Sequence, residues 1–291
     1  MEVAYILWSE RAQRAYEAGH YEVAVRTAQR SLALQPNQPF TLELLGRSEF
    51  AVANFLEAAA AFRKAIDQRA IKDDGLIEAF GDALAAERAP AAALREFSGW
   101  IDQHPNWKSV LAVRLELARL TLAASGEAAA DAVLSPAVAP NADVMPPELR
   151  GRYGWWFYEA GQFDTAEKWL QGAVRERPGE QVLQVRLAWA QVEQRNLESA
   201  IGRFHNVIYQ SQSSADRDWN RRARIINEAH LGLAVAYWQS HLADNAKSEF
   251  SIGALSLPEW LNPKWVGALY SPGVAKTIEE LKAARVKRHA N

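Results

Sequence analysis

The sequence holds few residue types that act as nucleophiles or metal ligands, and those present are scattered. It contains no Cys among its 291 residues, which excludes disulfides, thiolate nucleophiles and Cys-based metal sites. Among its six His, His230 and His241 are about three helical turns apart, too far to share a metal ion. Phosphate-binding glycine loops and the HExxH and GxSxG patterns are also missing from the sequence. We therefore predict a non-enzymatic chain with no catalytic residue, no metal site and no cofactor.

Two acidic pairs and one basic run are the remaining candidates for chemistry. Asp73-Asp74 and Glu279-Glu280 could do acid–base work on glycans only if held apart across a cleft. Both pairs stand at predicted helix starts, where carboxylates favour the helix dipole. The basic run combines Arg with an aromatic residue, as nucleic-acid sites do, but acidic residues interrupt it and the net charge is -2. We interpret it as a solvated helix face or an ion-pair zone and expect no nucleic-acid partner. Its members are Arg217, Trp219, Arg221, Arg222 and Arg224.

Composition is that of a soluble globular protein, with 49% hydrophobic and 23% charged residues. Glu2, Glu10 and Arg11 come too early for a signal peptide, and no run of about 18 apolar residues occurs. These features predict a cytoplasmic location by default, or a periplasmic one if a leader has been removed, and no membrane span.

Helical periodicity dominates the chain, and short breaks punctuate it at regular intervals. Segments such as EAAAAFRKAI place apolar residues on one stripe of an amphipathic helix. Pro36, Pro105, Pro178 and Pro258 each follow a helix-like ending, at separations of 69, 73 and 80 residues. These separations equal two units of about 34 residues plus 1, 5 and 12, and about 34 residues is the period of a helix-turn-helix repeat.

The chain resembles the tetratricopeptide repeat (TPR) family over nearly its whole length. The family pattern places small residues where the two helices of a unit meet, an aromatic beside them and a Pro after the second helix. Matching residues recur in several units: Gly46, Phe55, Ala58 and Phe62; Gly81, Ala93 and Phe97; Gly154, Phe163, Ala166 and Ala173; Ala188, Ala200 and Phe204; Ala234, Ala246 and Phe250. The resemblance implies an all-α TPR-like helix-turn-helix solenoid of about seven repeats with a C-terminal capping helix.

Departures from the pattern suggest how the chain is divided. We predict an N-terminal block over 1–135, a Pro-rich loop or linker over 136–147 and a C-terminal block over 148–258. The last block contains an insertion at 211–224, which we expect to lengthen the following helix. Residues 259–291 form a predicted capping segment whose helix starts at Ser271-Pro272.

The resemblance also implies which side chains line the inner face, the concave surface built from the first helix of each repeat. In the C-terminal half this face gathers Trp and Tyr beside Arg, and clustered Trp and Arg are the usual anchors of recognition sites. The alternative is that these rings are packed under the insertion or the Pro-rich loop. The predicted peptide-binding residues are Arg47, Phe50, Arg119, Arg152, Trp155, Tyr158, Arg186, Trp189 and Trp238.

Three functions are compatible with this pattern. The first is a protein-interaction scaffold that binds a peptide or helix of a partner on its inner face. The second is a glycan-binding or glycan-processing protein that uses Trp platforms with Glu159 and Glu193. The third is a homo-oligomer in which a terminal helix docks on a neighbouring copy. The Lys and Asn clamp of chaperone-binding TPR domains is absent, since Ser9 and Gln13 stand at its first matching positions.

Overall fold

The computed structural model describes residues 2–69, 73–107, 110–134, 147–213 and 219–289. Across these ranges the secondary structure is entirely helical, with sixteen α-helices and two 3-10 turns. The chain divides into two compact units, Met1–Ala139 and Pro140–Asn291. The division falls inside the predicted loop 136–147, of which only residue 147 lies within the described residues, so the predicted block boundaries stay predictions.

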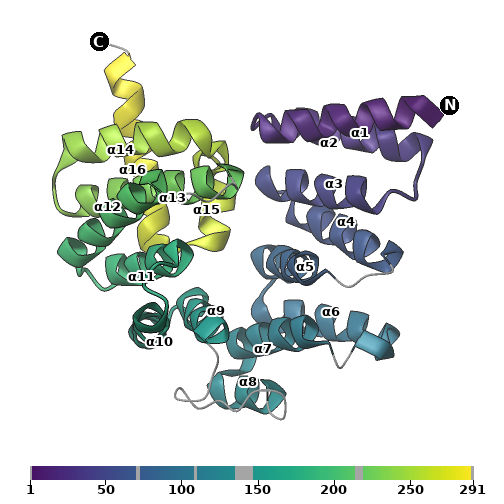
Figure 1. Ribbon diagram of the computed structural model, residues 1–291, viewed down its shortest axis with the longest axis horizontal. Helices are drawn as coiled ribbons and strands as arrows, with labels where there is room; N and C mark the ends of the chain where they lie inside the picture. Colours follow the sequence, from purple (N-terminus) through teal and green to yellow (C-terminus); the bar gives the residue numbers. More distant parts are fainter. Residues whose placement is uncertain (1, 70–72, 108–109, 135–146, 214–218, 290–291) are drawn as a thin grey trace. The chain divides into compact units, whose positions relative to one another are not determined.

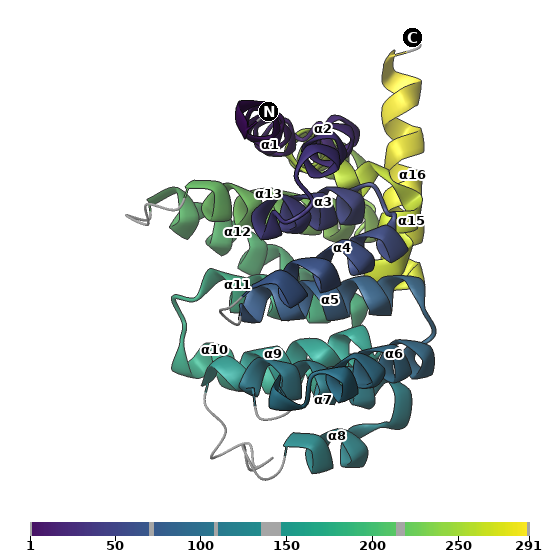
Figure 2. The same ribbon diagram turned by 90° about the vertical axis from the view of Figure 1, so that its right-hand side faces the viewer.

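The N-terminal unit consists of consecutive helix pairs, which Figures 1 and 2 show side by side. Its helices are α1 (Glu2–Glu17), α2 (Tyr21–Leu34), α3 (Pro39–Ala51), α4 (Phe55–Gln68), α5 (Asp74–Glu87), α6 (Pro90–Gln103), α7 (Leu111–Ser125) and α8 (Glu127–Leu134), with a 3-10 turn η1 (Pro105–Trp107) after α6. The second helix of the fourth pair, α8, has only eight residues, as its short apolar pattern predicts.

Small residues allow the paired helices to approach closely. A methyl group at Gly46 on α3 would lie 2.6 Å from ring carbons of Phe62 on α4, so only glycine fits there. Phe62 belongs to a core cluster that continues through Phe80, Phe97 and Trp100. These contacts confirm that the small and aromatic positions of the repeat form the core of this unit.

The C-terminal unit repeats the same arrangement and then adds further elements. Its helices are α9 (Pro147–Glu159), α10 (Phe163–Glu176), α11 (Gln181–Glu193), α12 (Leu197–Ser213), α13 (Trp219–Gln239), α14 (Ala243–Ser256), α15 (Pro263–Leu269) and α16 (Pro272–His289), with a 3-10 turn η2 (Pro258–Leu261) after α14. The long α13, with 21 residues, confirms that the insertion lengthens this helix. Residues 214–218 of the insertion lie outside the described residues.

The end of the C-terminal unit was only partly predicted. The helix expected at Ser271-Pro272 is α16, and the Ser271 hydroxyl accepts the Val274 N–H at 3.2 Å as an N-cap. This helix packs against α13, α14 and α15 and buries Val274 and Ile278. The sequence did not predict η2 or α15, which is capped by Asn262. The fold is therefore the predicted all-α array of helix pairs closed by a terminal helix.

The turns inside the helix pairs also repeat. Gly19 and Gly161 adopt positive φ values of 73° and 74° there. Three non-glycine residues take the same left-handed conformation in other pairs, at Ala53, Arg195 and His241. The repeat thus imposes a turn that favours glycine, and the side chains at these three positions are tolerated against a backbone cost.

Candidate binding surface

The predicted aromatic face of the C-terminal unit begins on α9. The rings of Trp155 and Tyr158 stack with centroids 4.4 Å apart and planes 9° from parallel. The Arg186 guanidinium, from α11, lies 5.3 Å from the centroid of the Trp155 ring. Tyr158 is buried and its hydroxyl donates to the Glu193 carboxylate at 3.2 Å. The predicted Trp and Arg neighbours therefore meet, but they engage one another and the protein interior.

The structure corrects the prediction that Trp189 is one of the exposed residues of the groove. Its side chain is 0% exposed. The ring stacks on Trp260, with centroids 5.7 Å apart and planes 19° from parallel, and packs against Tyr270 at 5.3 Å. Both of these rings come from the C-terminal segment, which we define as residues 257–281. This segment folds back onto the first helices of the repeats.

Two polar contacts extend this cover. The indole N–H of Trp238 on α13 donates to the Glu280 carboxylate on α16 at 2.7 Å. Ser271 also lies beside the Glu193 carboxylate, which accepts a hydrogen bond from the Tyr158 hydroxyl. Trp238 is half-buried by this arrangement. The C-terminal segment thus occupies the inner face of its own unit with aromatic rings, a hydroxyl and a carboxylate.

Two carboxylates under this cover have perturbed acidity. Burial raises the pKa of Glu193 above its ordinary value, against the opposing effect of hydrogen bonds from Ser271 and Tyr158. Burial also raises the pKa of Glu228 on α13, although Arg224 and Arg186 pull it down. The Trp189 indole N–H also lowers the pKa of Glu228, although it makes no hydrogen bond of normal geometry. Each acid therefore binds its proton more tightly in the folded unit than in the unfolded chain.

These shifts predict that acidification stabilises the C-terminal unit. A folded state that holds protons more tightly than the unfolded chain loses stability as pH rises above the ordinary carboxyl pKa of 4.5. Glu228→Gln removes the buried charge while keeping the shape. It should raise the free energy of unfolding at about pH 7 and change it much less at pH 4.5. Urea denaturation at the two pH values, with the exposed Glu198→Gln as control, measures this; an equal effect at both would contradict it.

The predicted binding residues of the N-terminal unit are Arg47, Phe50 and Arg119, and they differ in exposure. Arg119 on α7 is 7% exposed. Its Nε and Nη2 donate to the Glu116 carboxylate at 2.8 and 2.5 Å, and Nη2 lies 3.2 Å from the Asp82 carboxylate. It is a buried structural ion, which corrects its assignment as a binding residue. Phe50 is half-buried, with its ring centroid 5.2 Å from that of Phe55 in the core.

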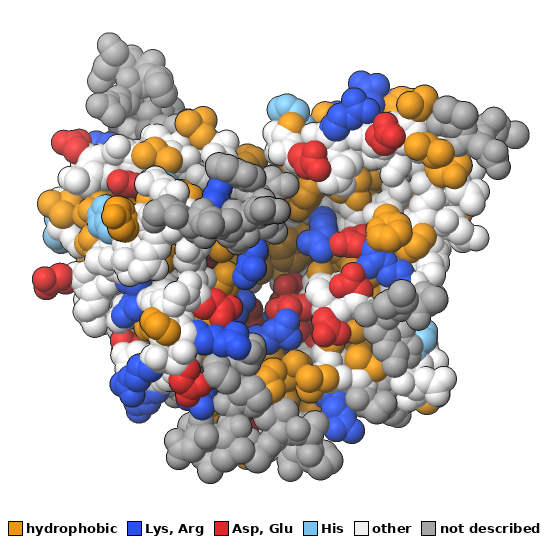
Figure 3. All heavy atoms as spheres, in the orientation of Figure 1, with side chains coloured by type: hydrophobic (Ala, Val, Ile, Leu, Met, Phe, Trp, Pro, Cys, Tyr) orange, Lys and Arg blue, Asp and Glu red, His pale blue; other side chains and the backbone are white. Residues whose placement is uncertain are grey.

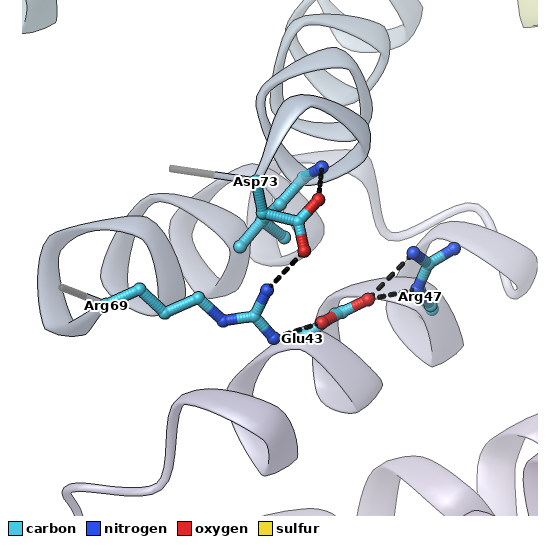
Figure 4. Close-up of polar contacts among 5 residues, drawn as sticks. Glu43, Arg47, Arg69 and Asp73 are labelled. Atoms are coloured by element: carbon cyan, nitrogen blue, oxygen red, sulfur yellow. Dashed lines mark hydrogen bonds and ion pairs between the residues drawn. The ribbon is translucent and has the colours of Figure 1, made fainter. Parts of the chain in front are cut away.

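Arg47 is exposed and belongs to a network on α3, shown in Figure 4. Its Nε and Nη2 donate to one Glu43 oxygen at 2.9 and 2.7 Å. The other Glu43 oxygen pairs with Arg69, which also pairs with Asp73 at 2.6 Å. Asp73 caps α5 by accepting the Leu76 N–H at 3.1 Å. The carboxylate considered for catalysis is thus a helix cap and an anchor for Arg69.

The most exposed aromatic side chain beside this network was missed from the sequence. The Phe40 ring is 78% exposed, and the Arg69 guanidinium lies 4.8 Å from its centroid. Ile6, 34 residues earlier at the equivalent place on α1, is 45% exposed. The repeat register would have found both, since each follows the start of a first helix on the expected inner face.

Comparisons with known proteins bear on the fold. No family model and no curated protein matches the chain. Among solved structures, a tetratricopeptide repeat protein from Parabacteroides merdae is 13% identical, with a TM-score of 0.47, covering 96% of this chain and 99% of that one. The C-terminal part of a TPR repeat-containing protein from Cytophaga hutchinsonii is also 13% identical, with a TM-score of 0.38, covering 90% and 100%.

These likenesses are low, so the fold assignment rests on the helix pairs, their left-handed turns and their small-residue contacts. The fold is an all-α, TPR-like array of helix pairs.

The other side chains considered for chemistry make structural contacts. The described residues contain no cluster of His, Asp and Glu able to hold a metal ion. In the basic run, Arg222 is buried and Arg224 lies 3.2 Å from the Glu259 carboxylate, while Arg217 falls outside the described residues. On the face drawn in Figure 3, basic and acidic side chains are interspersed over both units. Within the described ranges, none of the helices combines the length and apolar character needed to cross a membrane.

Proposed function

We propose that this chain is a non-catalytic protein-interaction scaffold that binds a peptide or helix of a partner protein. The binding surface is the inner face of the N-terminal unit, centred on Phe40 with Ile6 and Arg47. The observation that carries the proposal is the exposure of the Phe40 ring in a rigid setting.

Phe40 has the properties of a preorganised anchor. An exposed aromatic ring is unfavourable in water and gains free energy when a partner covers it. Arg69 holds the ring from one side, and Arg69 is itself fixed by Glu43 and Asp73 (Figure 4). A ring that is already ordered loses little conformational entropy on binding, which increases affinity.

The neighbours of Phe40 indicate what the partner segment carries. Ile6 offers a second apolar contact one repeat away, so two apolar side chains of a partner could be covered together. The Arg47 side chain is 45% exposed, and its contacts with Glu43 involve Nε and Nη2. Arginine has five N–H donors, so a partner carboxylate could join at the exposed edge. We infer a segment with apolar side chains beside an Asp or Glu.

The C-terminal unit supports the proposal by internal precedent. Its inner face holds the chain's own segment 257–281 through stacked rings and through the bond from Trp238 to Glu280. This mode of contact, aromatic burial with a carboxylate at the margin, is the one proposed for the partner on the other unit. Of the predicted groove residues in the C-terminal unit, Arg152 and Trp155 stay candidates at its edge.

The other two functions receive less support. A glycan platform needs an open indole face, whereas Trp189 is covered and the Trp155 ring already contacts Tyr158 and Arg186. Assembly through an exchanged tail helix is also disfavoured, because α16 packs within its own unit.

A peptide selection tests the proposal. Random peptides displayed on phage are selected on the full chain, and synthetic copies are titrated by calorimetry. Phe40→Ala should weaken binding by about 2 kcal/mol, or roughly thirtyfold, because it removes the central anchor. Arg47→Glu should weaken the binding of acidic peptides in particular.

The matched control is Leu255→Ala, which truncates another exposed apolar side chain, on α14. It should leave peptide binding unchanged. Circular dichroism should give the same helix content for all variants, since Phe40 and Leu255 are both exposed. Selected peptides that bind wild type and Phe40→Ala equally would refute the proposal.

A further inference from the structure

A cavity of about 550 Å³ in the C-terminal unit has no role in the functions considered above. It lies where the turns that follow α11 and α13 meet the first half of α16. Its volume falls within the range of small-molecule sites in proteins. Its lining includes the side chains of Arg195, Trp238, Gln239, His241, Lys276 and Glu280.

Basic groups dominate the charged lining. Arg195 comes from the first turn, His241 from the second and Lys276 from α16, so three separate segments contribute. The one carboxylate, Glu280, is engaged by the Trp238 N–H at 2.7 Å and lies 3.9 Å from the Lys276 Nζ. A local excess of positive charge in a chain of net charge -2 favours an anion.

The backbone at the cavity is strained in two of its turns. Arg195 and His241 both have φ of 62°, in turns where other repeats use Gly19 and Gly161. The left-handed conformation costs a non-glycine residue about 1–2 kcal/mol. Among the described residues, Ala53 is the one other non-glycine residue with a left-handed backbone, and it does not line this cavity. Strain of this kind concentrates at functional sites, where a particular side chain is needed at a particular place.

The start of α16 also contributes to the wall. Gly273, in the first turn of this helix, lines the cavity, so the positive end of the helix dipole adds to the basic side chains.

We propose that this cavity binds a small organic anion. Its carboxylate or phosphate lies between Arg195 and Lys276, and its carbon skeleton packs against Trp238. The same site accepts either kind of anionic group, since both are bound by Arg and Lys.

Binding of two probes to the full chain tests the proposal. Citrate supplies carboxylates with a hydroxyl, glycerol 3-phosphate supplies a phosphate with hydroxyls, and glycerol is the neutral control. Calorimetry gives the affinity, and the NMR signal of the Trp238 indole N–H, assigned with Trp238→Phe, reports the place of binding. At least one anion should shift that signal saturably by about 10 mM, and glycerol should not. Which probe binds distinguishes carboxylate from phosphate.

Matched variants separate this site from general attraction of anions. Arg195→Asn removes the charge but keeps a residue that tolerates left-handed φ, and Lys276→Gln removes the second charge. Each should weaken binding about tenfold or more, whereas Lys168→Gln, an exposed lysine on α10, should not change it. The proposal is overturned if neither anion shifts the Trp238 signal, or if both site variants bind as tightly as wild type.

Discussion

Replacing Trp189 by alanine should lower the free energy of unfolding of the C-terminal unit by about 3–5 kcal/mol. The side chain is fully buried between Phe204, Trp260 and Tyr270, so its removal leaves a large apolar cavity. It also removes the stacked pair that holds the C-terminal segment in place. Urea denaturation followed by circular dichroism at 222 nm measures the change, and limited proteolysis assigns it to this unit.

The control for this prediction is Phe40→Ala, which truncates an exposed aromatic ring in the other unit. Its effect on stability should stay within about 0.5 kcal/mol. A Trp189→Ala protein as stable as wild type, with intact helix content, would mean that the ring is not part of the core. In that case the recognition surface predicted from the repeat register would have to be reinstated.

Arg119→Met should destabilise the N-terminal unit by about 3–5 kcal/mol. The reason is the carboxylate left behind, because Glu116 is 3% exposed and loses the guanidinium that binds it at 2.5 and 2.8 Å. Glu116 has no room to turn away towards α5. Its oxygen already lies where a methyl group on Gly81 would stand, at 1.8 Å.

Adding Glu116→Leu to Arg119→Met tests this explanation. The double variant should recover much of the lost stability, because apolar residues of similar volume replace a buried ion pair at little cost. Thermal and urea denaturation of wild type, both single variants and the double variant complete the cycle. Equal instability of the double and the single Arg119 variant would argue that Arg119 contributes by packing alone.

Local features of this fold could be predicted from the sequence because their causes are local. Helices end before Pro36 and Pro178, since proline cannot continue a helix, and Gly46 stands where two helices touch. The aromatic and small positions of each repeat therefore indicated the core. Fold class follows from such repeated local rules.

The fate of the inner face could not be predicted in the same way. Whether Trp189 is exposed depends on Trp260 and Tyr270, which come from a segment outside the repeat pattern. The sequence predicted a capping helix from Ser271-Pro272, but it did not indicate on which face the segment would pack. Arg119 likewise looked like a surface anchor until Glu116 and Asp82 were placed beside it. Whether a residue is buried depends on neighbours that are distant in the sequence, and the register of one repeat does not predict those neighbours.

The folding back of residues 257–281 has a consequence for synthesis on the ribosome. The core cluster that runs from Leu42 to Leu120 lies within the N-terminal unit, so this unit can fold while the remaining chain is still being made. Trp189, by contrast, is translated well before Trp260 and Tyr270, so α11 leaves the exit tunnel with an uncovered indole. Nascent chains stalled between these points should be held by chaperones or degraded, and release should coincide with the arrival of the segment that covers them.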